Sequence, residues 1–115
     1  YDDSFSNIEN IKIPELLSNV EPSYHLYPLQ IDFKKLLFSK VELFERMKKA
    51  GINLQVHYIP IHLQPFYKKN YGFQQGDFPI SERFYQNELS LPIYPDLSDK
   101  NVSLVIDSIL EIIPT

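Results

Sequence analysis

Three histidines have the widest chemical range of any side chains in this sequence, namely His25, His57 and His62. An imidazole can bind a metal ion or exchange a proton near neutral pH. His57 and His62 are five residues apart, on a predicted strand and the loop after it, so they do not share one face as a helical i, i+4 pair would. No cysteine is present, and no obvious carboxylate completes a ligand shell. We therefore predict no metal site and expect polar or interfacial histidines.

Other catalytic patterns are also missing from the sequence. The serines that could act as nucleophiles fall in predicted strands or at expected helix starts, and no Gly-x-Ser-x-Gly motif occurs. The three glycines form no glycine-rich phosphate loop ahead of a helix. A Schiff-base lysine needs an apolar setting that lowers its pKa, whereas the lysines here lie in polar stretches or at helix ends. We predict that this chain by itself is not an enzyme and holds no cofactor.

The composition is that of one small globular domain. The chain has 115 residues, 43% of them hydrophobic, with eight Tyr and eight Phe, whereas disordered chains contain few aromatics. A net charge of −4 argues against nucleic acid as a partner, because phosphate binding needs a basic surface. No apolar run approaches the ~20 residues that span a membrane. The lack of cysteine fits a cytoplasmic protein, and a first residue other than Met leads us to expect a piece of a longer chain.

The clearest predicted helix covers residues 39–50. Ser39 and Glu42 have the spacing of a capping box, in which each side chain binds a free backbone N–H near the other. Apolar side chains recur at helical spacing and predict its buried face: Val41, Phe44 and Met47, with Leu43 and Ala50 flanking. A second helix is predicted over residues 81–89, with Ser81 as its cap and Ile80 among its inward residues. A third starts after Ser98 and carries a wide apolar stripe.

Alternating side chains predict short strands at residues 23–32, 54–58 and 91–94. Pro28 cannot donate to a ladder, so the first strand is expected to lie at an edge or to bulge there. In the second strand, one face is expected to meet the domain's own core: Leu54, Val56 and Tyr58. His57 would then point away from that core, toward an interface with another domain. The simpler alternative is a half-exposed strand histidine stacked on a neighbouring aromatic.

The remaining segments are predicted to be irregular. Residues 60–79 contain three prolines, two glycines and several aromatics, which indicates a long functional loop packed against a partner surface. Residues 1–22 are interpreted as a connector with one short helical piece, and residues 23–115 as the domain itself. The predicted fold class is α+β: a small sheet of short, mainly antiparallel strands covered by helices.

Several stretches, in this order, resemble the C-terminal small domain of the DegT/DnrJ/EryC1 family of pyridoxal-phosphate sugar aminotransferases. They are residues 25–29, 51–52, 56–67, 78–82, 89–95 and 97–98. Within the family, residues 55–65 are most similar to the branch that aminates a UDP-linked 4-keto-6-deoxy sugar in pseudaminic acid biosynthesis.

The resemblance implies a fold-type I aminotransferase whose large domain, absent from this sequence, carries the lysine for pyridoxal phosphate. Such enzymes move an amino group from glutamate to a nucleotide-linked keto sugar, and they are homodimers. The resemblance places His57 and Tyr58 at the active-site mouth, where they approach the sugar nucleotide. His62, Tyr67 and His25 are further substrate-binding candidates, for which structural roles serve equally well.

Two alternatives remain open from the sequence. One is a free-standing α+β module that binds a small ligand or a protein through residues 60–79. The other is a dehydratase or regulatory relative with the same fold, because the lysine that would decide this lies outside the chain.

Overall fold

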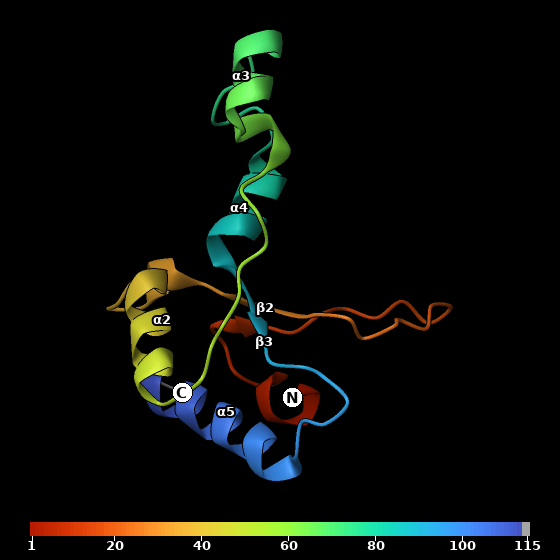
Figure 1. Cartoon of the computed structure of the whole chain (residues 1–115), viewed down its shortest axis with the longest axis vertical. Helices are drawn as coiled ribbons and strands as arrows, with labels where there is room; N and C mark the ends of the chain where they lie inside the picture. Colours follow the sequence, from red (N-terminus) through yellow and green to blue (C-terminus); the bar gives the residue numbers. More distant parts are fainter. Residues whose placement is uncertain (114–115) are drawn as a thin grey trace.

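The fold is built on one small antiparallel sheet, seen in a computed structural model that describes residues 1–113. Its strands are β1 (Ile11–Lys12), β2 (Tyr27–Ile31) and β3 (Glu88–Leu91), in the order β1-β2-β3. Tyr27 pairs with Leu91 across β2 and β3, and Ile11 pairs with Ile31 across β1 and β2. Two helices, α2 (Lys40–Lys49) and α5 (Asp99–Ile112), pack against each other beside this sheet (Figure 1). The predicted α+β class is confirmed.

The core lies between β2 and the helices. Alternate residues of β2 are buried, as expected for a strand with one face toward a core. Leu29 and Ile31 of β2 pack with buried side chains of α2, β3 and α5: Leu43, Met47, Leu89, Val105 and Ile109. The first residues join the same core, because α1 (Asp2–Phe5) buries Phe5 and β1 buries Ile11.

Pro28 occupies the central strand of the sheet, so the prediction of an edge strand is wrong for β2 as a whole. The ladder between β1 and β2 includes only Gln30 and Ile31 of β2. At Pro28 the strand is therefore paired only with β3, through Ser90. This local gap explains how a residue without an N–H is accommodated in the middle strand.

Helix α2 begins as predicted and buries only part of the predicted stripe, since Met47 is buried and Phe44 partly buried. The Ser39 side chain accepts from the Glu42 N–H at 3.3 Å, and the Glu42 carboxylate accepts from the Ser39 N–H at 2.7 Å, which confirms the capping box. The fully buried residues are Leu43 and Met47, whereas Val41 is 66% exposed. The centre of the buried face lies at Leu43, which was predicted only to flank the stripe, because spacing alone does not say which side of a helix faces the sheet. The start of α5 at Ser98 is confirmed, since its side chain accepts from the Asn101 N–H at 3.3 Å.

Residues 60–79 contain helical segments, so the predicted continuous loop is wrong in part, and only residues 72–78 form an irregular stretch of some length. They form two short helical turns, η2 (Ile61–Leu63) and α3 (Pro65–Tyr71), which are followed by α4 (Pro79–Asn87). Pro65 fits the first position of α3, where its missing N–H costs nothing, and Gly72 ends that helix with a left-handed φ of 72°. Helices α3 and α4 form an arm that extends away from the sheet (Figure 1).

The boundaries around α4 also differ from those predicted. Pro79 begins the helix, so Ser81 lies inside it and caps nothing, and Ile80 is exposed. Strand β3 covers Glu88–Leu91 rather than 91–94, since it ends before Pro92. A 3₁₀ turn, η1 (Phe33–Lys35), links β2 to α2. No helix formed by residues 1–113 is long and apolar enough to cross a membrane.

Candidate functional site

The segment that carries His57 runs beside β3 but is not a strand. Gln55 makes an isolated bridge with Ser90, with N–H to carbonyl distances of 2.7 and 3.2 Å. The predicted strand at 54–58 therefore reduces to one bridge. At His57 the backbone N–H donates to the Glu88 side chain instead of continuing a ladder, at 2.9 Å. This side-chain contact replaces the backbone partner that a longer strand would need.

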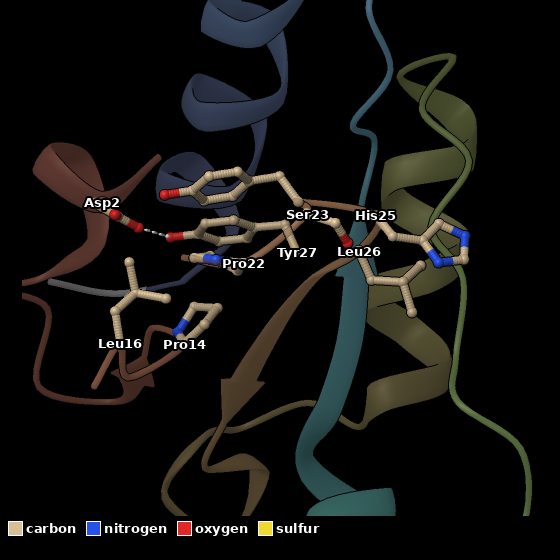
Figure 2. A pocket seen from close by; sticks show the side chains of 9 residues that line it. Asp2, Pro14, Leu16, Pro22, Ser23, His25, Leu26 and Tyr27 are labelled. Atoms are coloured by element: carbon tan, nitrogen blue, oxygen red, sulfur yellow. Dashed lines mark hydrogen bonds between the residues drawn. The ribbon is translucent and has the colours of Figure 1, made fainter. Parts of the chain in front are cut away.

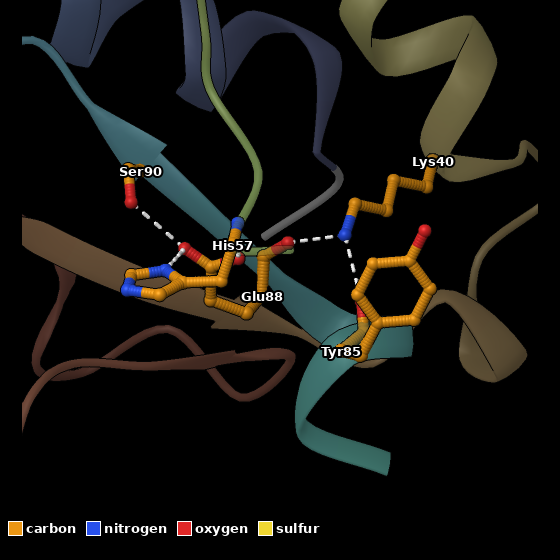
Figure 3. Close-up of polar contacts among 5 residues, drawn as sticks. All are labelled: Lys40, His57, Tyr85, Glu88 and Ser90. Atoms are coloured by element: carbon orange, nitrogen blue, oxygen red, sulfur yellow. Dashed lines mark hydrogen bonds and ion pairs between the residues drawn. The ribbon is translucent and has the colours of Figure 1, made fainter. Parts of the chain in front are cut away.

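Glu88 is the centre of a buried polar cluster (Figure 3). Its carboxylate is 0% exposed in a fold that is otherwise apolar at this depth. Glu88 Oε1 lies 2.9 Å from His57 Nδ1 and 2.8 Å from the Ser90 hydroxyl, while Oε2 accepts the His57 backbone N–H. A buried carboxylate is tolerated when donors surround it in this way. The cluster fixes the position of the His57 ring relative to the sheet.

The prediction that His57 points away from the domain's own core is wrong. Its ring turns toward Glu88 of β3, although 38% of the side chain remains exposed. Of the residues expected on the core face, Leu54 is partly buried against the core, whereas Val56 and Tyr58 are exposed, at 45% and 92%. His57 also makes an edge contact with Phe84 of α4, at 6.0 Å between ring centroids. This contact with Phe84 agrees with the simpler alternative, a half-exposed histidine beside a neighbouring aromatic.

Lys40 closes the other side of the cluster. Its amine donates to the Tyr85 carbonyl at 2.8 Å and to the Glu88 carbonyl, and it lies 5.4 Å from the Tyr85 ring centre. Burial lowers the pKa of Lys40, and the nearby Glu88 charge acts in the opposite direction. Sequence reasoning did not expect a desolvated lysine. Because both carbonyls accept from its ammonium group, Lys40 joins α2 to the end of α4 and does not fit the lysine that would hold pyridoxal phosphate.

A second buried pair lies in the arm, formed by His62 of η2 and Glu82 of α4. His62 Nε2 is 2.8 Å from Glu82 Oε1, and both side chains are buried. The Gly76 N–H donates to the same carboxylate at 2.8 Å. The pKa of Glu82 is lowered, first by the His62 hydrogen bond and further by the backbone N–H groups of Gly76 and Phe78, against an opposing effect of burial. This pair holds the turn between α3 and α4 together.

His25 is exposed and borders two cavities beside the sheet. The first, of about 240 Å³, also includes Asp2 and Tyr27 (Figure 2). The Tyr27 hydroxyl donates to Asp2 Oδ1 at 2.5 Å, and burial, followed by this contact, raises the pKa of Tyr27. The second cavity, of about 360 Å³, adds polar groups from the segment near His57, from β3 and from the residues after β3: Asn53, Gln55, Ser90 and Tyr94.

The structure does not bring the five predicted residues together in one place. His25 lines the larger cavity with Ser90, whose hydroxyl donates to Glu88, the partner of His57. His62 and Tyr67 line a separate pocket of about 330 Å³ in the arm. Tyr58, which lies between His57 and His62 in the sequence, is almost fully exposed.

Sequence reasoning missed the two buried carboxylates, Glu88 and Glu82. For Glu88 the sequence did offer a signal, because it stands directly before an apolar stretch. A charged side chain in a buried segment must have a partner. Neither pair extends to a metal site: residues 1–113 contain no group of three or more His, Cys, Asp or Glu that could hold a metal ion.

Known proteins resemble the chain over nearly its whole length. A model of the DegT/DnrJ/EryC1/StrS aminotransferase family matches residues 1–110. The spore coat polysaccharide biosynthesis protein SpsC of Bacillus subtilis is 35% identical over 98% of the chain and 29% of its own length. The UDP-4-amino-4,6-dideoxy-N-acetyl-beta-L-altrosamine transaminase of Campylobacter jejuni is 33% identical over the same shares, 98% and 29%. The chain thus spans about 29% of the length of these curated relatives.

Solved structures share the fold. PseC, a Helicobacter pylori aminotransferase involved in the biosynthesis of pseudoaminic acid, matches with a TM-score of 0.81 and 28% identity, over 96% of this chain and 29% of PseC. Spr1654 of Streptococcus pneumoniae, solved in a PLP-form, matches with a TM-score of 0.82 and 30% identity, over 96% of this chain and 28% of its own. With residues 1–110 matched by the family model, the chain belongs to the DegT/DnrJ/EryC1/StrS aminotransferase family.

Proposed function

We propose that the chain is the C-terminal small domain of a pyridoxal-phosphate-dependent aminotransferase. The whole enzyme transfers an amino group from glutamate to a nucleotide-linked 4-keto-6-deoxy sugar used in surface polysaccharide or glycan biosynthesis. The observation that carries this proposal is the family match over residues 1–110, combined with a span of about 29% of the relatives' length. A relative named as a UDP-amino-sugar transaminase supports the sugar class.

The other parts of the enzyme are supplied by a large domain in the same polypeptide. The engagement of the Lys40 amine by two backbone carbonyls supports this division, because it makes this desolvated lysine unsuited to hold the cofactor. Residues 1–22 lead from the large domain and add α1 and β1 to the core and sheet of the small domain, which residues 23–115 otherwise form. The whole enzyme is a cytoplasmic homodimer that binds neither nucleic acid nor membranes.

His57 and Tyr58 contact the nucleotide sugar in this proposal. Support comes from their position at the surface, with the His57 ring anchored at 2.9 Å to Glu88 and Tyr58 largely exposed. A rigid element that presents a polar group at the surface is suited to substrate binding. His62 and Tyr67, which share a pocket, and His25, which borders two cavities, are further contacts.

The test compares two proteins. One is expressed from the coding region together with its upstream part, and the other is the 115-residue chain alone. With pyridoxal phosphate, an absorption band of the bound cofactor is expected in the longer protein only. Glutamate and a UDP-linked 4-keto-6-deoxy sugar should then give an amino sugar, detected by mass spectrometry. Replacing His57 with Ala should lower sugar turnover while circular dichroism stays unchanged.

Other outcomes would contradict this proposal. A cofactor band in the short chain would mean that one of its own lysines binds the cofactor. No band in either protein would favour a dehydratase-like relative or a free-standing α+β binding module. The exposed aromatics of the arm support the binding module as the second candidate, since Phe66 and Tyr71 lie at the surface.

A further inference from the structure

We infer that Glu88 is a positioning residue for His57: it holds the proton on Nδ1 and presents Nε2 to a hydroxyl of the bound sugar. This inference rests on the proposed function for its substrate. The assignment of the ring proton and of the ring orientation rests on the hydrogen-bond donors around Glu88. Glu88 and His57 are 31 residues apart in the chain and meet only in the folded domain.

The hydrogen-bond donors decide which ring nitrogen carries the proton. The His57 backbone N–H can only donate, and it is 2.9 Å from Glu88 Oε2. The Ser90 hydroxyl lies 2.8 Å from Oε1, within reach to donate to it. As an ionised carboxylate Glu88 can only accept, so we assign a donor to the ring nitrogen 2.9 Å from Oε1. Nδ1 therefore carries a proton, and Nε2 is the nitrogen left for another partner.

The ring is held in one orientation as well as one tautomer. Glu88 binds the same residue at two points, its backbone N–H and its ring, which leaves the side chain little rotational freedom. Phe84 contacts the ring at an angle of 71° and limits it further. With Nδ1 turned toward β3, Nε2 points the opposite way, and 38% of the side chain is exposed. An outward acceptor of this kind suits a hydroxyl donor on a sugar.

Glu88 itself is rigidly placed. It begins β3, where it pairs with Gln30 of β2, and its own carbonyl accepts from Lys40. The Glu88 carboxylate contacts three groups: the Ser90 hydroxyl, the His57 backbone N–H and the His57 imidazole. The Ser90 side chain is buried and the N–H belongs to the backbone, so only the imidazole is a side chain that reaches the surface. A fully buried carboxylate that supports a half-exposed imidazole has the geometry of an outer partner that orients a functional histidine.

Nitrogen NMR of the 115-residue chain with labelled histidine tests the tautomer without any activity. His57 is expected to show a protonated Nδ1 and an unprotonated Nε2 at neutral to slightly alkaline pH. In Glu88→Gln, the amide oxygen must take the backbone N–H, so the amide NH₂ faces Nδ1 and the ring proton should move to Nε2. The exposed Glu45→Gln should leave the wild-type pattern unchanged.

Kinetics of the longer protein test the role in substrate binding. Glu88→Gln should lower kcat/KM for the keto sugar about 10- to 100-fold, the range found when the outer partner of a metal-bound histidine is removed. The separate reaction with glutamate should keep its rate, because His57 is placed at the sugar. A loss in both reactions would indicate a general structural defect and would overturn the positioning role.

The two measurements separate the possible failures. A wild-type His57 that carries its proton on Nε2 overturns the inference even if Glu88→Gln does not fold. Unchanged sugar kinetics in Glu88→Gln also overturn it. If the wild-type longer protein transfers no amino group, the proposed function fails, and the NMR result alone decides whether Glu88 orients His57.

Discussion

Truncation of Leu43 tests which face of α2 forms the core. Leu43 is 0% exposed and packs in the buried cluster with residues of β2 and α5. Leu43→Ala removes three buried carbon groups, worth about 0.8 kcal/mol each, or roughly 2.4 kcal/mol in total. The cavity left behind adds to this, because the surroundings relax only in part. We expect the free energy of unfolding to fall by about 3–4 kcal/mol.

Val41→Ala is the matched control on the same helix. Val41 is 66% exposed, and alanine has the higher helix propensity, so the change should stay within about 0.5 kcal/mol. Urea denaturation followed by circular dichroism measures both variants. A small domain has only about 5–15 kcal/mol of stability, so the two midpoints should separate clearly. A cost below about 1 kcal/mol for Leu43→Ala, or an equal cost for Val41→Ala, would refute the assignment of the buried face.

Two further predictions concern polar contacts that hold local structure. His62 lowers the pKa of Glu82 below the ordinary 4.5, so this pair stabilises the fold above that pH and the contribution is lost as the pH falls through the lower folded value. Glu82→Gln should therefore flatten the acid side of the stability profile in denaturation experiments, and an unchanged acid slope would contradict the pairing. Ser39→Ala should cost about 1 kcal/mol through loss of the α2 cap, whereas Ser81→Ala, inside α4, should cost less in the same assay; equal costs would show that the cap contributes nothing.

Local signals in the sequence were sufficient where an element depends on its own neighbours. The Ser39–Glu42 capping box and the Ser98 cap were both predicted, because cap and N–H are three residues apart. The alternating burial of β2 also follows from its own pattern. The fold class and the family followed from these local patterns and from short motifs along the chain.

Local signals failed where an element depends on its surroundings. Prolines and glycines in residues 60–79 predicted a loop, although Pro65 and Pro79 start helices and Gly72 ends one. The same residues punctuate loops and helix ends, and short helices need contacts such as His62 with Glu82 to persist. The spacing in α2 predicted a helix but not its rotation, which the packing against α5 and the sheet decides.

The sequence by itself determined the elements whose cause is local: the helix starts at Ser39 and Ser98, the alternation of β2, and the motifs of the family. Only the tertiary structure decided that β2 is central and that His57 turns toward Glu88. The physical reason is the range of the interactions. A cap is satisfied within one helical turn, whereas the donors of a buried carboxylate come from whichever segments the core brings beside it.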